Sequence, residues 1–431
     1  MTAQPLTRRT SAARRVAPRR TSKLQRERHE PDYSILVAVV ALTAIGILMV
    51  YSSSAMKAFL RSEDTFAIVG PQIQWGVLGI AAMLVMMKVD YRLLRLVSLP
   101  AFVVAIGLLV VVLLPPIGGL IQPIKIGGSA RWLEIGPLPA VHPAEFAKLA
   151  MVLYLAHWMA GRGARIRGFL SGTLPFLVIV VPVSFLILRE PDLGTTTVVT
   201  LTALTMFFAA GANLVHLGML ALAAVAGVAI VGLRGYQLER IRAWLDPWSD
   251  PLGAGFHTIQ GLLALGLGGI LGAGLGESRM AGGLFLPNAQ NDFIFAVIGE
   301  ELGLVGGLLV IVLFLLIAYQ GVRVALSAPD TFGALLAAGI TAWLTIQAFV
   351  NIGVVVALVP ITGITLPFIS AGGSSLIISF AAVGILLSIS RETVEKGSWN
   401  DAPADRGRGD GRSRLPGPRR GPVAPGTDEL G

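Results

Sequence analysis

Ten long apolar stretches constrain this chain more than any other feature. A helix of about 20 residues crosses the roughly 30 Å hydrocarbon core of a bilayer, and each stretch is close to that length. Only 14% of the 431 residues are charged and 54% are hydrophobic, too apolar a composition for a water-soluble surface. We therefore expect an all-α polytopic membrane protein with ten transmembrane helices, at 34–51, 72–88, 96–115, 143–160, 171–188, 193–209, 214–233, 293–318, 332–356 and 372–390.

The distribution of Lys and Arg predicts the orientation, because cytoplasmic loops carry an excess of both. With both termini cytoplasmic, 24 of the 34 Lys and Arg residues lie inside and nine lie outside. This orientation exports the loops at 52–71, 116–142, 234–292 and 357–371. Half of the basic residues are in the two tails, so the +9 net charge indicates orientation and attraction to anionic membrane lipids, and no nucleic-acid partner is expected.

Composition divides the chain into three regions. Residues 1–31 are basic and have almost nothing to bury, and residues 392–431 are rich in Gly, Pro and Arg. We expect both to be disordered cytoplasmic segments. Between them, 32–391 forms the membrane domain, with the large extracytoplasmic loop 234–292 between the seventh and eighth helices. The first apolar stretch is long, a basic leader of about thirty residues precedes it and nine more stretches follow, which favours an uncleaved anchor over a cleaved signal peptide.

Several chemical classes find no support in the sequence. The chain has no cysteine, its five His residues show no metal-ligand spacing, and it contains no Walker loop and no GxSxG or HExxH motif. We therefore expect neither an ATP-driven pump nor a dedicated metal site. A divalent cation, Mg²⁺ or Mn²⁺, could still assist a pyrophosphate substrate.

Two charged residues inside the fourth predicted helix need an explanation, since charges within a membrane are costly. Glu145 and Lys148 are three residues apart and therefore share one helical face. They form either a structural ion pair or part of a cavity for a head group. Just upstream, Arg131 and Trp132 lie in an exported loop. Arg131 suits a pyrophosphate, and Trp132 suits either an interfacial anchor or a sugar face.

The end of the largest exported loop is the sharpest candidate for chemistry. Asp292 directly precedes an apolar helix, so it is either an N-cap or a partly desolvated carboxylate with the raised pKa of a general base. Glu300 and Glu301 lie two turns into that helix, and at least one should face the bundle interior. Glu190 and Asp192 form a tight exported connection, for which a turn and a cap are the default explanation.

At these motifs the chain resembles the FtsW/RodA (SEDS) family of bacterial cell-wall membrane proteins. The resemblance runs from about Asp32 to Arg391, and eight motifs occur in the family order. They are Gln74-Trp75, Gly128-Ser-Ala-Arg-Trp132, Pro143-Ala-Glu-Phe-Ala-Lys148, Glu190-Pro-Asp-Leu-Gly194, Asp246-Pro-Trp-Ser-Asp-Pro-Leu-Gly253, Leu286-Pro through Phe295, Glu300-Glu-Leu-Gly303 and Thr365 through Ser375.

The resemblance implies ten transmembrane helices and peptidoglycan glycosyltransferase activity on lipid II. It also implies a class B penicillin-binding protein as partner, together with other division proteins at the septal plasma membrane. By resemblance, Asp292 matches the essential acid, Trp132 the loop tryptophan, and Glu145 and Lys148 the acid and base of the cavity. The substrate-binding set implied by these motifs comprises Arg131, Trp132, Glu145, Lys148, Arg279, Glu300 and Ser374.

The chain departs from the family pattern at three places. It has Gln290-Asn291 where members usually have His-Thr before the aspartate, and Ala371 where a Tyr is usual. The customary Lys a few residues before Leu286-Pro287 is missing, and we expect Arg279 to substitute for it. Asp246-Pro-Trp248, Gly363 through Pro367 and Leu387 through Arg391 favour the division branch over the elongation branch.

These observations leave four hypotheses. The favoured one is an inverting polymerase of lipid II with Asp292 as general base and undecaprenyl pyrophosphate as leaving group. The alternatives are a lipid II flippase or transporter, which would also need a head-group cavity, and an elongation-type polymerase. A scaffold that recruits division proteins through its tails is a further non-enzymatic possibility.

Overall fold

The computed structural model describes residues 30–116, 121–126, 129–136, 139–232, 236–287 and 289–392. The basic arm before residue 30 and the tail after residue 392 lie outside these ranges, as do Gly127 and Gly128. All described residues belong to one compact unit, which ends at Thr393.

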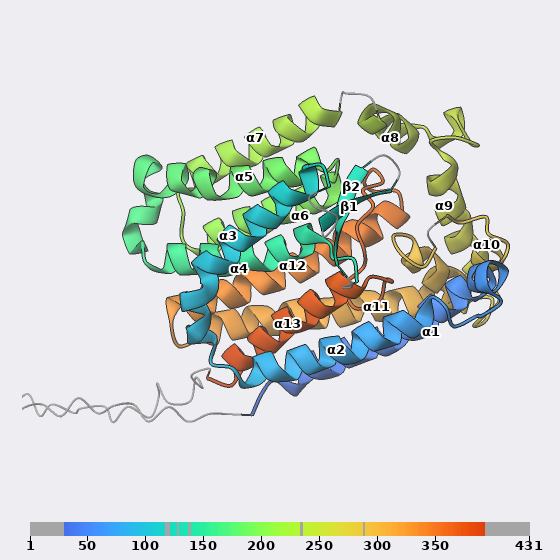
Figure 1. Ribbon diagram of the computed structural model, residues 1–431, viewed down its shortest axis with the longest axis horizontal. Helices are drawn as coiled ribbons and strands as arrows, with labels where there is room; N and C mark the ends of the chain where they lie inside the picture. The colour runs from blue at the N-terminus through green and yellow to red at the C-terminus, as the bar shows by residue number, and fades with distance from the viewer. Residues whose placement is uncertain are drawn as a thin grey trace, which may run out of the picture. The chain divides into compact units, whose positions relative to one another are not determined.

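Among the described residues, a long helix forms at each of the ten positions where a span was expected, and these helices run side by side (Figure 1). They are α1 (Tyr33–Ser62), α2 (Val69–Lys88), α3 (Leu94–Leu113), α4 (Pro143–Ala160), α5 (Leu174–Arg189), α6 (Leu193–Ala209), α7 (Leu214–Gly232), α11 (Ile294–Ser327), α12 (Thr331–Val355) and α13 (Gly373–Ser390). Helix α2 packs against α13, α11 against α1 and α12, and α12 against α4 and α6. The sequence underestimated α1 and α11, which continue well beyond their predicted ends at 51 and 318.

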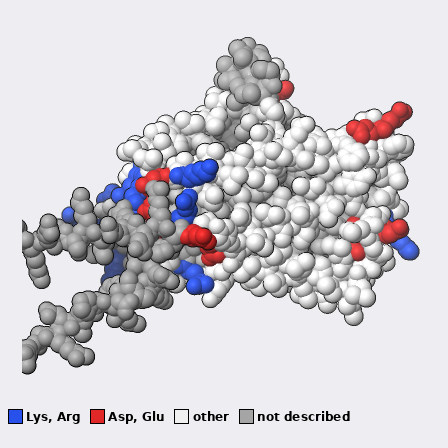
Figure 2. Space-filling view, turned by 90° about the horizontal axis from the view of Figure 1, so that it is seen from below, with Lys and Arg blue, Asp and Glu red and all other residues white. Residues whose placement is uncertain are grey.

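Seven helices in the described part of the chain are long and apolar enough to cross a membrane. Helices α4, α6 and α7 form where spans were expected but are not among the seven. Figure 2 shows charged side chains gathered at two ends of the face in view, with a wide band free of charge between them. This distribution is typical of a protein whose middle band faces lipid.

The loop at 116–142 contains an antiparallel hairpin, which the expectation of an all-α fold missed. Strand β1 (Ile121–Ile126) pairs with β2 (Ser129–Ile135), with a register shift between Ile124 and Lys125. A bridge from Leu133 to Val141 then leads the chain into α4. Helical periodicity could not reveal the hairpin because β-pairing depends on partners across a turn.

The segment between α7 and α11 is folded onto the helices. It holds α8 (Tyr236–Leu245), the 3-10 turn η4 (Pro247–Ser249), α9 (Phe256–Gly268) and α10 (Arg279–Gly282), which lie at one end of the bundle in Figure 1. Helix α11 is broken at Gly303, whose φ is 67°. Leu304 N–H donates to the Gly269 carbonyl at 3.0 Å, and Ala273 N–H donates to the Glu300 carbonyl at 2.9 Å. The end of α9 thus supplies partners for backbone groups freed by the break.

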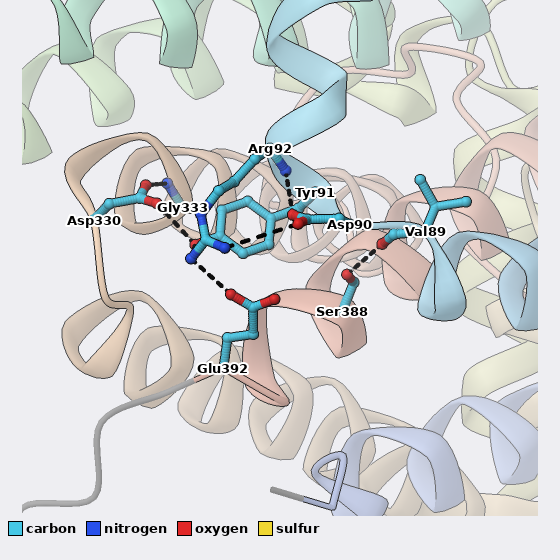
Figure 3. A network of polar contacts seen from close by, with 8 residues as sticks. All are labelled: Val89, Asp90, Tyr91, Arg92, Asp330, Gly333, Ser388 and Glu392. Carbon is cyan, nitrogen blue, oxygen red and sulfur yellow. Dashed lines mark hydrogen bonds and ion pairs between the residues drawn. The ribbon is translucent and has the colours of Figure 1, made fainter. Parts of the chain in front are cut away.

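The start of α1 and the end of α13 meet at one end of the bundle, where Asp32 N–H donates to Ser390 Oγ at 3.2 Å. A polar network closes this end (Figure 3). Arg92, in the 3-10 turn η1 (Tyr91–Leu93), pairs with Glu392 at 2.6 Å and with Asp330 at 3.3 Å. Asp330 also caps α12 by accepting from Gly333 N–H at 2.8 Å. The network therefore joins the connection between α2 and α3, the connection between α11 and α12, and the end of α13.

Candidate active site

Asp292 lies in the turn before α11 and does not cap it. The N-cap of α11 is Phe293, and no side chain accepts a capping hydrogen bond there. The N-cap explanation for Asp292 is therefore wrong. No described residue donates a hydrogen bond to its carboxylate, which faces the backbone of Gly363: a Cβ added there would lie 3.6 Å from Asp292 Oδ2. The acid is left available for chemistry.

Three backbone contacts fix the turn that carries Asp292. Asn351 Nδ2, on α12, donates to the Asp292 carbonyl at 2.9 Å. Ser370 Oγ donates to the Asn291 carbonyl at 2.7 Å, and Ala371 N–H donates to the Gln290 carbonyl at 2.9 Å. The motif from Thr365 to Ser375 therefore acts as a brace for the Asp292 turn.

The surroundings of Asp292 raise the pKa of its carboxyl. Burial raises the pKa of Asp292 to about 7, and the negative charge of Asp192 adds to the effect. Arg131 and Arg240 act in the opposite direction but do not cancel it. Arg240 belongs to α8, which is held on the loop between α12 and α13 because Trp244 Nε1 donates to the Ala357 carbonyl at 2.8 Å. A pKa near 7 suits a general base at neutral pH.

Arg131 projects from β2 toward the connection between α5 and α6. Its Nε donates to the Glu190 carbonyl at 3.1 Å and its Nη2 to the Pro191 carbonyl at 2.6 Å. The guanidinium is half-buried and close enough to Asp292 for its charge to lower that pKa. Arg131 therefore combines a fixed position with a positive charge at the candidate base.

Glu190 and Asp192 are two further acidic residues in the region of Asp292. Asp192 caps α6, as expected, by accepting from Thr195 N–H at 2.9 Å. Glu190 is fully buried, and neither carboxylate oxygen has a hydrogen-bond partner among the described residues. Burial, followed by the charge of Asp192, raises the pKa of Glu190 to about 9. Glu190 is therefore protonated at neutral pH and adds no negative charge beside Asp292.

Glu145 and Lys148 form a buried pair on α4. Lys148 Nζ lies 2.8 Å from Glu145 and donates to Gln347 Oε1 at 2.7 Å. The ammonium also lies 5.1 Å from the centre of the Trp343 ring. Gln347 and Trp343 come from α12, so the pair joins α4 to α12. The expected pairing of Glu145 with Lys148 is confirmed, whereas their role in substrate binding stays a prediction.

Trp132 and Ser374 lie on either side of His142, the N-cap of α4. The indole meets the His142 ring edge-to-face at 5.2 Å. His142 N–H donates to Ser374 Oγ at 3.4 Å. His142 also lies within the fields of Glu145, Asp192 and Arg131. The structure thus gathers six of the predicted site residues in one region, namely Arg131, Trp132, Glu145, Lys148, Asp292 and Ser374.

Glu300 and Arg279 belong to a different cluster, at α10. The Glu300 carboxylate accepts from Ser278 Oγ at 2.5 Å and from Arg279 N–H at 2.8 Å. The next carboxylate, Glu301, accepts from Ser52 Oγ and from Gly276 N–H. Both glutamates are buried, in agreement with the expectation for this helix. Their oxygens hold the loop before Leu286, and the Arg279 side chain is exposed.

No group of three or more His, Asp or Glu side chains within the described ranges is arranged to hold a metal ion. The described residues therefore do not form a cation site on their own. Sequence reasoning also missed Asn351, Gln347 and Arg240, whose contacts with the site depend on packing between distant segments. For Asn351 and Gln347, the available signal was an amide inside an apolar stretch.

The chain is similar to proteins of one family. Residues 33–395 match the FtsW/RodA/SpoVE family, described as cell cycle proteins. The chain is 42% identical to stage V sporulation protein E of Bacillus subtilis over 362 residues, which cover 84% of this chain and 97% of the relative. It is also 42% identical to the "probable peptidoglycan glycosyltransferase FtsW" of Geobacter metallireducens over 360 residues, covering 83% and 94% of the two chains.

Two solved structures share the fold. One comes from work on a peptidoglycan synthase complex that coordinates polymerization and crosslinking, with a TM-score of 0.67, 30% identity, and coverage of 84% of this chain and 98% of that chain. The other is the rod shape determining protein RodA of Thermus thermophilus, with a TM-score of 0.61, 26% identity, and coverage of 85% and 98%. On the match over 33–395 and these likenesses, the chain belongs to the FtsW/RodA/SpoVE family of cell cycle proteins.

Proposed function

We propose that the protein is a peptidoglycan glycosyltransferase that polymerises lipid II during septal cell-wall synthesis. The observation that carries the proposal is the Asp292 carboxyl, which lacks a capping role, faces Gly363 and has a pKa raised to about 7 by burial. The names of the FtsW relatives support the same activity class. A flippase has no evident need for such an acid on the exported side alone.

In this mechanism Asp292 accepts the proton of the 4-hydroxyl of the acceptor sugar. The hydroxyl oxygen attacks the anomeric carbon of the lipid-linked donor, and the carbon–oxygen bond to undecaprenyl pyrophosphate breaks with its electron pair. An α-linked donor then gives a β-1,4 bond by inversion, which needs one base and no covalent intermediate. Asp292 is the only residue to which this scheme assigns proton transfer.

Arg131 is the cation we assign to the departing pyrophosphate. Its guanidinium is already anchored by the Glu190 and Pro191 carbonyls, so little reorganisation is needed as charge develops. Trp132 and Ser374, joined through His142, would contact the sugar and head group, and Glu145 with Lys148 would shape the cavity beside them. Mg²⁺ or Mn²⁺ could assist the pyrophosphate, but no step here depends on it.

We further propose a topology of ten transmembrane helices with both termini cytoplasmic. The contact of Asp32 with Ser390 puts the two ends of the bundle on one side, as an even number of spans requires. A class B penicillin-binding protein is the proposed partner, which fits the likeness to a complex that couples polymerization to crosslinking. The division septum is the proposed location.

The direct test is polymerisation of purified lipid II by the full chain with its partner transpeptidase. The Asp292→Asn variant should express, bind lipid II and form no glycan strands. Asp246→Asn, in the exposed turn before α9, is a matched control and should retain activity. An active Asp292→Asn variant would exclude Asp292 as base. Lipid II movement across liposomes without strand growth would favour the flippase.

A further inference from the structure

A second basic site lies beside the Asp292 turn and has no role in the mechanism above. A cavity of about 260 Å³ opens between the exported end of α1 and the segment that follows α10. Lys57, Leu60 and Arg61 form one wall, and Leu286 and Gln290 belong to the other. Gln290 is two residues from Asp292, so the cavity shares a wall with the candidate catalytic turn.

Lys57 and Arg61 are an unusual pair for this position. They are four residues apart on α1 and therefore lie on one face, where two like charges repel each other. No acidic side chain of the described ranges pairs with either of them. Lys57 is half-buried, so its charge is not fully hydrated. Arg61 is exposed at the rim, and an anion bound between the two cations would relieve their repulsion and compensate the partial burial of Lys57.

The rest of the cavity is apolar. Ala281, Leu284 and Pro287 line the side opposite the cations. The volume is below the roughly 300–1,000 Å³ of pockets that enclose whole small molecules. It therefore suits a charged head-group fragment that is attached to an apolar chain, rather than a complete sugar-peptide substrate.

We propose that this cavity binds the diphosphate of a polyprenyl-linked lipid, with Lys57 and Arg61 as its ligands. A diphosphate carries two adjacent anionic groups, which match two cations one helical turn apart. The proposal rests on the proposed function in one respect: it gives the diphosphate of the acceptor lipid a place next to the Asp292 turn, whereas Arg131 is assigned to the departing diphosphate of the donor. Lys57 and Arg61 also lie near the segment before Leu286, where members of the family usually have a lysine that this chain lacks.

Cysteine labelling tests the cavity without any turnover, because the natural chain has no cysteine. Leu60→Cys puts a thiol on the cavity wall, and the side chain it replaces is 63% exposed, so the fold should tolerate it. Farnesyl diphosphate should slow maleimide labelling of this full-length variant in detergent. The matched control is Leu252→Cys, on an exported turn outside the cavity, whose labelling should not change.

Lys57→Gln or Arg61→Gln, added to Leu60→Cys, should each raise the half-protecting concentration of farnesyl diphosphate about tenfold, as expected for a lost charge-assisted hydrogen bond. Lys88→Gln removes a cation from the end of α2 and should leave protection unchanged. Absence of protection, equal protection in all variants, or equal protection by phosphatidylglycerol would each overturn the proposal. Because no acceptor is present, these results are independent of whether the protein polymerises lipid II.

Discussion

Asn351, near the C-terminal end of α12, donates a hydrogen bond of 2.9 Å to the backbone carbonyl of Asp292. The same Nδ2 donates to the Ile364 carbonyl at 2.8 Å, so one buried amide ties the turn that carries Asp292 to the loop between α12 and α13. A buried carbonyl without a donor costs about 1–3 kcal/mol. The position of the candidate base therefore depends on a residue that does not touch substrate.

Replacing Asn351 with Ala should lower both stability and activity, because two buried carbonyls lose their donor. We expect a loss of about 1–3 kcal/mol in unfolding free energy and a fall in kcat larger than the change in KM. Gln320→Ala, at a buried amide on α11 near the opposite end, is the control and should leave kcat unchanged. Equal effects of the two variants on kcat would show that Asn351 acts only through stability.

The rate of polymerisation should rise with pH through a midpoint near 7, because only ionised Asp292 can accept a proton. Asp192→Asn removes a charge that raises the pKa of Asp292, so its midpoint should move to lower pH. Asn also caps helices well, which preserves the start of α6. Arg131→Gln removes a charge that lowers the pKa, so its midpoint should move to higher pH. Profiles of kcat/KM that coincide for all three proteins would contradict this assignment.

The raised pKa also predicts an effect on stability. Asp292 binds its proton more tightly in the folded chain than in the unfolded one, so ionisation destabilises the fold as pH rises from about 4 through about 7. Asp292→Asn cannot ionise and should raise Tm at pH 8, with a smaller gain at pH 5.5. Thermal unfolding in detergent at the two pH values measures this difference. A lower Tm of the variant at pH 8 would show that the carboxylate is stabilised by contacts.

The positions of the long helices were predictable from the sequence because their signal is local. Helices form where apolar stretches were found, and α4 begins at Pro143 and ends at Ala160 as predicted, whereas only seven helices of the described residues are long and apolar enough to cross a membrane. The pairing of Glu145 with Lys148 also follows from helical spacing alone. In contrast, the hairpin formed by β1 and β2 and the break at Gly303 depend on backbone partners elsewhere in the chain.

The same distinction explains the candidate site. Asp292, Arg131 and Trp132 were identified because their motifs are specific. The brace by Asn351 depends on contacts between α12 and two loops, which no spacing rule gives. Of the two explanations that the sequence left open for Asp292, a cap or a desolvated carboxyl with a raised pKa, burial in the packed structure favours the second.

The buried pair on α4 should behave as a unit. Glu145→Gln leaves Lys148 without its counter-charge, and Lys148→Met leaves Glu145 in the same state, so each should cost about 3–5 kcal/mol. The double variant removes both charges and should recover most of the thermal stability. We expect it to remain inactive, since the proposed cavity needs the pair. Full activity in a stable double variant would reduce the pair to a structural role.

Gly303 should tolerate no side chain. Its φ of 67° and ψ of −164° belong to a region that is almost exclusive to Gly, and a Cβ would lie 2.4 Å from the Gly272 nitrogen. We expect Gly303→Ala to cost at least about 1–3 kcal/mol from backbone strain and to loosen the end of α9 from α11. Gly307→Ala, one turn further along α11, meets only an ordinary contact at 3.5 Å with Phe295 and serves as the control. Hydrogen exchange at the amides of Ala273 and Leu304 reports on the docking, and unchanged protection in Gly303→Ala would show that the break does not depend on glycine.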